Sequence, residues 1–297
     1  MRYRRLTSVV RRERSGTTVS DTEGKVSYKA SEMHEDVEKE IERLRDQALW
    51  SWDKESRNLA WFGLRDGMSI LEVGSGPGFV TEQLLAAHPN SHVTCVEIDP
   101  DLIPRAERYL QSKGMEGRYT IIQGDLMKME LPDDSFDFAL ARLVFQHLPD
   151  PLGAMKEIHR VLKPGGKLAI TDVEGGLKWV IDPPDSAEVE AIIEKMEKAQ
   201  ESRGGNRQIG RKLWRLLGAA GYVNMDLEIV PIHSDKLGIE AIIPSDWDPG
   251  AFKPALDRGT ITEEDVETMH KAHTAFHASP DRYALFVALM ACGEKPA

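Results

Sequence analysis

A glycine-rich turn with an acidic residue before it is the clearest chemical feature of the sequence. In the stretch 70–80, ILEVGSGPGFV, the residues Gly74, Gly76 and Gly78 separate an apolar run from an amphipathic segment. Such a turn between a strand and a helix lets backbone atoms approach a ligand closely. A dinucleotide-binding fingerprint has the spacing GxGxxG, whereas this loop reads GxGxG. The carboxylate of Glu72 would also repel a bound pyrophosphate, so its charge weighs against a dinucleotide.

Acidic residues also end the next two apolar runs. Glu97 ends the run 92–97, where a carboxylate is placed to accept hydrogen bonds from both hydroxyls of a ribose. Asp99 is its rival, but it precedes Pro100 and is expected to be the N-cap of a helix that begins there. Asp150 before Pro151 is expected to do the same for a later helix.

Between about Ser69 and Asp172 the chain resembles class I S-adenosylmethionine (SAM)-dependent methyltransferases. The Glu-x-Gly-x-Gly-x-Gly loop resembles their first motif, and FDFALARLVFQHLPDP and VLKPGGKLAITD resemble the fourth and fifth. The subgroup it resembles methylates small molecules, among them quinones and natural products. The resemblance implies that SAM is the cofactor, with its ammonium near Glu72, its ribose on Glu97 and its adenine amine on Asp125. The full set of implied cofactor-binding residues is Glu72, Gly74, Gly76, Gly78, Glu97, Ile98, Asp125, Leu126 and Arg142.

Methyl transfer from a sulfonium is an in-line displacement, so the protein mainly aligns the reactants and excludes water. An acceptor hydroxyl or acidic carbon benefits from proton removal, which makes a histidine near the end of the fourth strand a candidate general base. His147, in ARLVFQHLPD, is that candidate, and its setting resembles phosphoethanolamine methyltransferases, whose matching histidine takes part in catalysis. A histidine that only orients the following turn is the alternative.

Several polar residues further along the chain are candidate acceptor contacts. They are Asn206, Arg207, His233, His273 and His277. The last two share a face with His270 at helical spacing, but apolar residues occupy the same face, so we expect packing and no metal site. The fourth strand lacks the signature of enzymes that methylate base amines, and the acceptor is expected to be a secondary-metabolite or quinone-like small molecule methylated on O, N or C.

The apolar runs that position these residues alternate with amphipathic segments, as in a parallel sheet with crossover helices. They are 69–73, 92–97, 119–123, 136–141 and 167–172, followed by an expected edge strand at 223–232 beside a buried strand at 283–292. We therefore predict a doubly wound, Rossmann-like α/β fold with seven strands, the last of them antiparallel, and helical cap insertions.

The same patterning predicts the organisation of the chain. It consists of a disordered basic arm (1–30), an N-terminal helical lid (31–66) and a SAM-binding domain (67–297) with cap insertions at about 176–207 and 233–281.

The composition limits the classes of molecule with which the protein is expected to interact. A net charge of -11 disfavours nucleic acid, and no apolar run is long enough to span a membrane, so we expect a cytoplasmic protein acting on a small molecule, with a homodimer left open. Cys95 and Cys292 are expected to stay unpaired. Two alternatives to an active methyltransferase are an NAD-dependent oxidoreductase and a non-catalytic SAM-binding protein.

Overall fold

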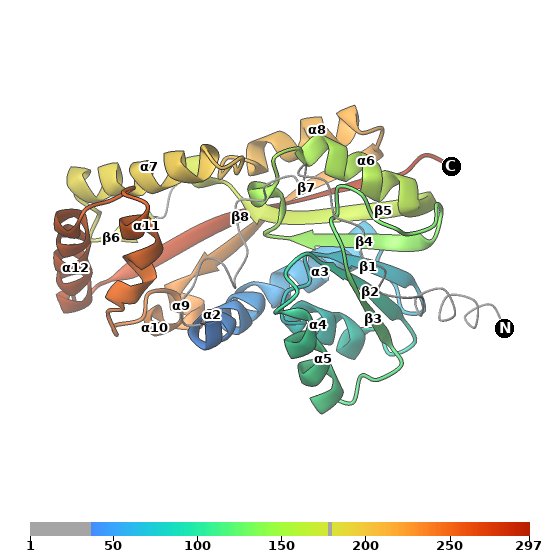
Figure 1. Ribbon diagram of the computed structural model, residues 1–297, viewed down its shortest axis with the longest axis horizontal. Helices are drawn as coiled ribbons and strands as arrows, with labels where there is room; N and C mark the ends of the chain where they lie inside the picture. The colour runs from blue at the N-terminus through green and yellow to red at the C-terminus, as the bar shows by residue number, and fades with distance from the viewer. Residues whose placement is uncertain (1–36, 178–179) are drawn as a thin grey trace, which may run out of the picture.

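The computed structural model describes residues 37–177 and 180–297, so the predicted basic arm lies outside the described residues. A twisted eight-stranded sheet lies at its centre in the order β3-β2-β1-β4-β5-β8-β6, with β7 paired to β8 (Figure 1). The strands are β1 (Ser69–Val73), β2 (His92–Glu97), β3 (Tyr119–Gln123), β4 (Phe136–Arg142), β5 (Leu162–Val173), β6 (Val180–Asp182), β7 (Val223–His233) and β8 (Tyr283–Glu294).

Strands β1 to β5 are parallel, and β8 runs antiparallel to β5, β6 and β7. The central strands are apolar on successive residues because helices cover both faces of the sheet. The predicted doubly wound fold with an antiparallel last strand is thus confirmed, as is the edge position of β7 beside β8. The three-residue strand β6 is an addition that the sequence pattern did not predict.

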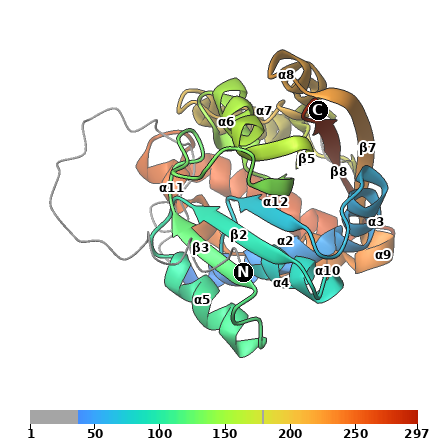
Figure 2. The same ribbon diagram turned by 90° about the vertical axis from the view of Figure 1, so that its right-hand side faces the viewer.

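Two groups of helices enclose the sheet (Figure 2). Helices α6 and α8 pack on one face, whereas α2, α3, α4 and α5 pack on the other. The helices are α2 (Val37–Trp50), α3 (Trp52–Phe62), α4 (Phe79–Ala87), α5 (Ile103–Ser112), α6 (Pro151–Val161), α7 (Ala187–Glu201), α8 (Leu213–Ala219), α9 (Ser234–Leu237), α10 (Ile239–Ile242), α11 (Lys253–Asp257) and α12 (Glu263–Ala278). Short 3-10 turns occur at Phe145–His147, Gly175–Leu177, Gly210–Lys212 and Pro249–Phe252.

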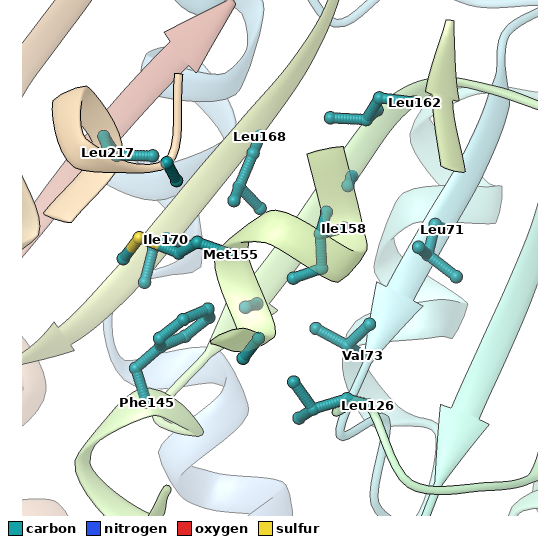
Figure 3. Close-up of a cluster of buried hydrophobic side chains, with 14 of the residues drawn as sticks. Leu71, Val73, Leu126, Phe145, Met155, Ile158, Leu162, Leu168, Ile170 and Leu217 are labelled. Carbon is teal, nitrogen blue, oxygen red and sulfur yellow. The ribbon is translucent and has the colours of Figure 1, made fainter. Parts of the chain in front are cut away.

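The core beneath α6 fixes the strand ends that carry the site. Met155 and Ile158 of α6 are fully buried and lie among the side chains of β1 and β5, including Leu71 and Ile170 (Figure 3). Burying a side chain of this size stabilises the fold by about 1.5–3 kcal/mol, so the sheet supplies a rigid base. The loops at the carboxyl ends of β1, β2 and β4 are therefore held in fixed relative positions.

The helix starts show one correct and one wrong prediction. Asp150 is the N-cap of α6, and its carboxylate accepts a hydrogen bond of 2.9 Å from the amide of Gly153. Asp99 is not a helix cap: α5 begins at Ile103, and the Asp99 carboxylate instead accepts from the amide of Asp101 at 3.0 Å. The Asp99 carboxylate binds the amide two residues further along the chain and so forms a local turn. This turn delays the start of α5 until the second proline of the segment.

A separate cap covers one end of the sheet. Helices α7, α11 and α12 lie together with β6 at the end of the molecule remote from α5 (Figure 1). Their own small core includes Ile192 of α7, Val266 of α12, and Ile261, which precedes α12. These elements fall within the two insertions predicted at 176–207 and 233–281.

Both cysteines are buried and free, as predicted. Cys95 lies on β2 and Cys292 on β8, with β1, β4 and β5 between them in the sheet, which is too far for a disulfide. Within the described residues, no helix combines the length and the apolar character needed to cross a membrane.

Candidate functional site

The glycine loop lies at the carboxyl end of β1 and leads into α4. Gly74 has a φ of 68°, and its amide donates to the carbonyl of Val96 at 2.8 Å, which ties the loop to β2. A Cβ at this residue would meet the side chain of Val144 at 2.4 Å. Only glycine satisfies both the backbone conformation and the close approach of the loop after β4.

Glu97, at the end of β2, holds the loop from the other side. Its Oε2 accepts from the amide of Gly76 at 2.7 Å, and its Oε1 accepts from the amide of Asp99 at 2.9 Å. Burial raises the pKa of Glu97, and these amide donors offset part of that effect. Each oxygen keeps a second lone pair, so the carboxylate can still accept bonds from a ligand.

Glu72 lies on β1 and is 4% exposed. The hydroxyl of Thr81 donates to its Oε2 at 2.6 Å. The pKa of Glu72 is raised to about 7, chiefly by burial and to a smaller extent by the charge of Glu97; the hydrogen bond from Thr81 and the charge of Arg142 act in the opposite direction. Two buried carboxylates close together favour a cation between them and disfavour an anion.

A cavity of about 640 Å³, here called the glycine-loop cavity, opens beside these residues. This size is typical of small-molecule sites. The implied cofactor-binding residues that line it are Glu72, Gly74, Gly76, Glu97, Ile98, Asp125, Leu126 and Arg142. Gly78 does not line the cavity: it starts α4 with a φ of 84°, and a Cβ there would meet Leu110 of α5 at 3.3 Å.

His147 also lines the glycine-loop cavity, in the short turn after β4. The preceding residue, Gln146, is fixed on both sides: its amide donates to Asp172 at 3.2 Å, and its carbonyl accepts from the amide of Asn206 at 2.6 Å. The side-chain amide of Gln200, on α7, lies 3.3 Å from Nδ1 of His147. The turn, the core and the cap thus determine together where the imidazole lies.

Burial, together with the smaller effects of the positive charges of Arg207, Arg43 and Arg203, lowers the pKa of His147 to about 3. The imidazole is therefore uncharged at neutral pH. Nδ1 accepts from the Gln200 amide, so in the uncharged ring Nε2 carries the proton and is a hydrogen-bond donor, and the ring is a weaker proton acceptor than an ordinary histidine.

Arg142 ends β4 and binds the N-terminal helices. Its Nε lies 3.0 and 3.1 Å from the two carboxylate oxygens of Glu55, and its Nη2 donates to the carbonyl of Gln47 at 2.7 Å and to Ser51 at 3.2 Å. Glu55 is 1% exposed, so this is a buried ion pair. It docks α2 and α3 over the glycine-loop cavity, a role that the sequence did not predict for this arginine.

A second cavity of about 980 Å³, here called the cap cavity, lies among α7, α11 and α12. Of the predicted acceptor contacts, Arg207 lines both cavities and His273 lines the cap cavity. Neither cavity is lined by Asn206, His233 or His277. Asn206 instead shapes its own loop, since its side-chain oxygen accepts from the amide of Gln208 at 2.9 Å.

The histidines of α12 pack against aromatic side chains. The ring of His270 stacks on Trp247 with centroids 4.9 Å apart, and Nε2 of His273 lies 2.8 Å from the carbonyl oxygen of Pro244. Nδ1 of His277 lies 3.8 Å from a carboxylate oxygen of Glu240. In the part of the chain that the structure describes, no group of three His, Cys, Asp or Glu residues is arranged to hold a metal ion.

Gln200, Arg203 and Arg43 line the glycine-loop cavity but were not predicted. Gln200 and Arg203 belong to the predicted insertion, where the sequence contains no motif. The only available signal was the segment 203–207, RGGNR, in which two arginines flank a flexible pair of glycines.

The family comparison bears on this geometry directly. Residues 71–170, which include the glycine loop, Glu97 and His147, match the family model described as a methyltransferase domain. The chain contains a methyltransferase domain. This result confirms the predicted class I SAM-dependent methyltransferase, a family whose cofactor is SAM.

Curated relatives match part of this chain. Sterol 24-C-methyltransferase erg6 of Aspergillus fumigatus is 36% identical over 108 residues, which cover 36% of this chain and 28% of the relative. The chain therefore spans little more than a quarter of the length of that relative. The uncharacterized methyltransferase YdaC of Bacillus subtilis is 29% identical over 195 residues, covering 66% of this chain and 91% of YdaC.

Solved structures share the fold over a longer stretch. The phosphoethanolamine N-methyltransferase 2 of Haemonchus contortus, solved with SAM, superimposes with a TM-score of 0.54 at 20% identity, covering 83% of this chain and 53% of that one. The YcgJ protein of Bacillus subtilis gives a TM-score of 0.52 at 17% identity, covering 82% and 97% of the two chains. At these identities the likeness supports the Rossmann-like methyltransferase fold alone.

Proposed function

We propose that the protein transfers a methyl group from SAM to a small-molecule acceptor. The observation that carries the proposal is the pair of buried carboxylates, Glu72 and Glu97, beside the glycine-loop cavity. SAM is a cationic ligand with a ribose, and it suits such a pair, whereas the pyrophosphate of NAD would be repelled by it. The oxidoreductase alternative is therefore disfavoured.

The residues around the cavity fit SAM group by group. Glu72 would bind the ammonium of the methionine moiety, and Glu97 would accept bonds from the ribose hydroxyls. Asp125 and Leu126, which line the cavity after β3, would contact the adenine. A Cβ at Gly76 would meet no atom within 4 Å, so the loop leaves open space for a ligand at this point.

SAM supplies an electrophilic methyl group on a sulfonium, and the chain supplies alignment and the exclusion of water. His147 lines the same cavity and borders Gln200 of the cap, which supports a position on the acceptor side. Because Nδ1 accepts from the Gln200 amide, Nε2 of the uncharged ring would donate a hydrogen bond to a lone pair of the acceptor and orient that group. General-base catalysis by His147 stays a prediction, since a pKa of about 3 makes proton transfer to it unfavourable unless a bound anion offsets the arginine charges.

The sterol relatives act, by their names, on a carbon atom, and the match to one of them covers 36% of this chain. The cap cavity, which the two insertions form, is where we expect acceptor specificity to be determined. We keep the small-molecule acceptor, methylated on O, N or C, as the proposal.

The proposal is tested by incubating the full chain with SAM labelled in its methyl group and a panel of metabolites. Label in a product, together with SAM binding in a direct titration, supports the enzyme. SAM binding without transfer to any member of a broad panel supports the non-catalytic SAM-binding alternative. Binding of NAD in preference to SAM would contradict the proposal.

A further inference from the structure

Two arginines lie where the two cavities meet. Arg203 and Arg207 follow α7 and line both the glycine-loop cavity and the cap cavity. Gln200 and Met196 of the same helix, together with Phe286 of β8, complete this shared wall. A ligand that reaches from the cap cavity toward His147 must pass these two guanidinium groups.

The guanidinium groups have few protein partners. The Nε atoms of Arg203 and Arg207 are both buried, and neither has a hydrogen-bond partner in the structure. Arg203 forms no ion pair with any carboxylate of residues 37–177 or 180–297, and Nε of Arg207 lies 3.7 Å from a carboxylate oxygen of Glu197, beyond hydrogen-bond distance. Glu174, another carboxylate that lines the cap cavity, is bound by Arg211 instead. Buried donors without a partner are rare in native proteins, and a ligand is one of the common reasons for them.

Arginines gather around this wall although the chain as a whole carries -11 and the carboxylates of Asp185, Glu190, Glu194 and Glu197 also line the cap cavity. Arg43 of α2, which is paired with Glu40, lines the glycine-loop cavity, and its charge acts on His147 together with those of Arg203 and Arg207. Arg258 of the cap lies close enough to lower the pKa of Arg203, after the larger effect of burial. Guanidinium groups gathered in this way repel one another, and a bound anion relieves that repulsion.

The cap cavity offers an apolar surface beside this charge. Trp247, Phe252, Met269 and Phe276 line it, and the rings of Trp247 and Phe252 stack with centroids 5.2 Å apart. Its volume of about 980 Å³ can hold an acceptor larger than a simple amino acid.

We propose that Arg203 and Arg207 bind an anionic group of the methyl acceptor, a carboxylate or a phosphate, while the apolar part of the acceptor occupies the cap cavity. Guanidinium groups suit both anions because their N–H donors match the spacing of the oxygen atoms. This inference rests on the proposed methyltransferase function and narrows its substrate class to amphipathic organic acids.

The test uses three ligands that share an aromatic body: 2-naphthoate, 2-naphthyl phosphate and the neutral 2-naphthamide. Each is titrated calorimetrically into the full chain saturated with S-adenosylhomocysteine. The variants are Arg203→Gln and Arg207→Gln, with Lys198→Gln as the matched control, because Lys198 lies on the last turn of α7, close to the two arginines in sequence, but lines neither cavity. The wild type should bind at least one anion about ten-fold or more tighter than the amide, as expected for charge-assisted bonds.

Both arginine variants should lose that preference, and the control should keep it. The melting temperature of ligand-free Arg203→Gln should stay the same or rise, since the change removes a partly buried cation that has no carboxylate partner. The carboxylate and the phosphate are told apart by which of the two naphthyl anions binds more tightly.

Three results would overturn the inference. They are equal affinity of the wild type for the amide and both anions, no binding of either anion, and retention of the anion preference in both arginine variants. A fourth is weakened binding of SAM in the arginine variants, which would show that they hold the carboxylate of the cofactor. Failure of the methyltransferase proposal has a different signature, because the wild type would then not bind SAM at all.

Discussion

The affinity for SAM should fall as the pH falls below 7, because of Glu72. The pKa of this carboxyl is raised to about 7 in the ligand-free protein, chiefly by burial. Above pH 7 the group is ionised and attracts the ammonium of SAM. Below pH 7 it is protonated, and binding of the cation must first expel that proton.

The size of the effect follows from the pKa. If the ammonium holds Glu72 ionised in the complex down to pH 5, the dissociation constant rises about fifty-fold between pH 7 and pH 5, or about 2.3 kcal/mol. Binding at pH 7 should also release about half a proton, since half of the free protein is protonated there. The ammonium of SAM itself stays mostly charged in this range.

Isothermal titration calorimetry at pH 5, 6 and 7, in buffers with different ionisation enthalpies, measures both quantities. Circular dichroism at each pH checks that the protein stays folded. The matched control is Glu72→Gln, which cannot ionise: its affinity should be lower at pH 7 and nearly independent of pH. A wild-type dissociation constant that does not change from pH 7 to pH 5, or an equal slope in Glu72→Gln, would refute the reasoning.

The other predictions concern four residues that form the site or hold it in place. Glu97→Ala should weaken SAM binding by about 1.5–3 kcal/mol through the lost ribose bonds, and unchanged affinity in a folded variant would remove that role. His147→Ala should lower turnover about two- to ten-fold with SAM affinity hardly changed, the scale of one lost orienting hydrogen bond; near-wild-type turnover would eliminate this role, and a loss of about 10²-fold or more would indicate a general base instead. Gly74→Ala should lower stability by about 1–3 kcal/mol in urea unfolding, because the added Cβ meets a side chain at 2.4 Å and the backbone is left-handed; an unchanged midpoint would contradict this close approach. Glu55→Ala should cost about 3–5 kcal/mol of unfolding free energy, since it leaves Arg142 buried without its carboxylate, and a cost below about 1 kcal/mol would show that the pair is solvated.

The central fold was predictable because its signals are local. Several apolar runs of the parallel sheet are followed at once by a turn residue, as Gly74 follows β1 and Gly124 follows β3. Asp99 shows where local signals compete. Two prolines follow it within five residues, and the helix begins near the second, because a turn closed by the Asp99 carboxylate comes first.

The site was only partly predictable, because its remaining parts come from contacts between distant segments. Arg142 stands in a recognisable motif, yet its partner Glu55 lies 87 residues earlier, in a helix without a motif. Gln200 reaches His147 across 53 residues. Arg203 resembles any surface arginine in the sequence, and its place in the wall between the two cavities follows from how distant segments fold against each other.

Strand β8 links the two halves of the molecule mechanically. Its carboxyl-terminal part pairs with β5, and its first residues, Tyr283–Leu285, pair with β6 of the first insertion. If the insertions moved away from the sheet, β8 would have to bend or lose its pairing with β5 or β6. The backbone hydrogen bonds between these strands oppose such a movement. We therefore expect an acceptor to enter by rearrangement of helices and side chains, without a hinged opening of the whole cap. A new specificity would evolve by substitutions along α7 and α12 while β8 keeps its position.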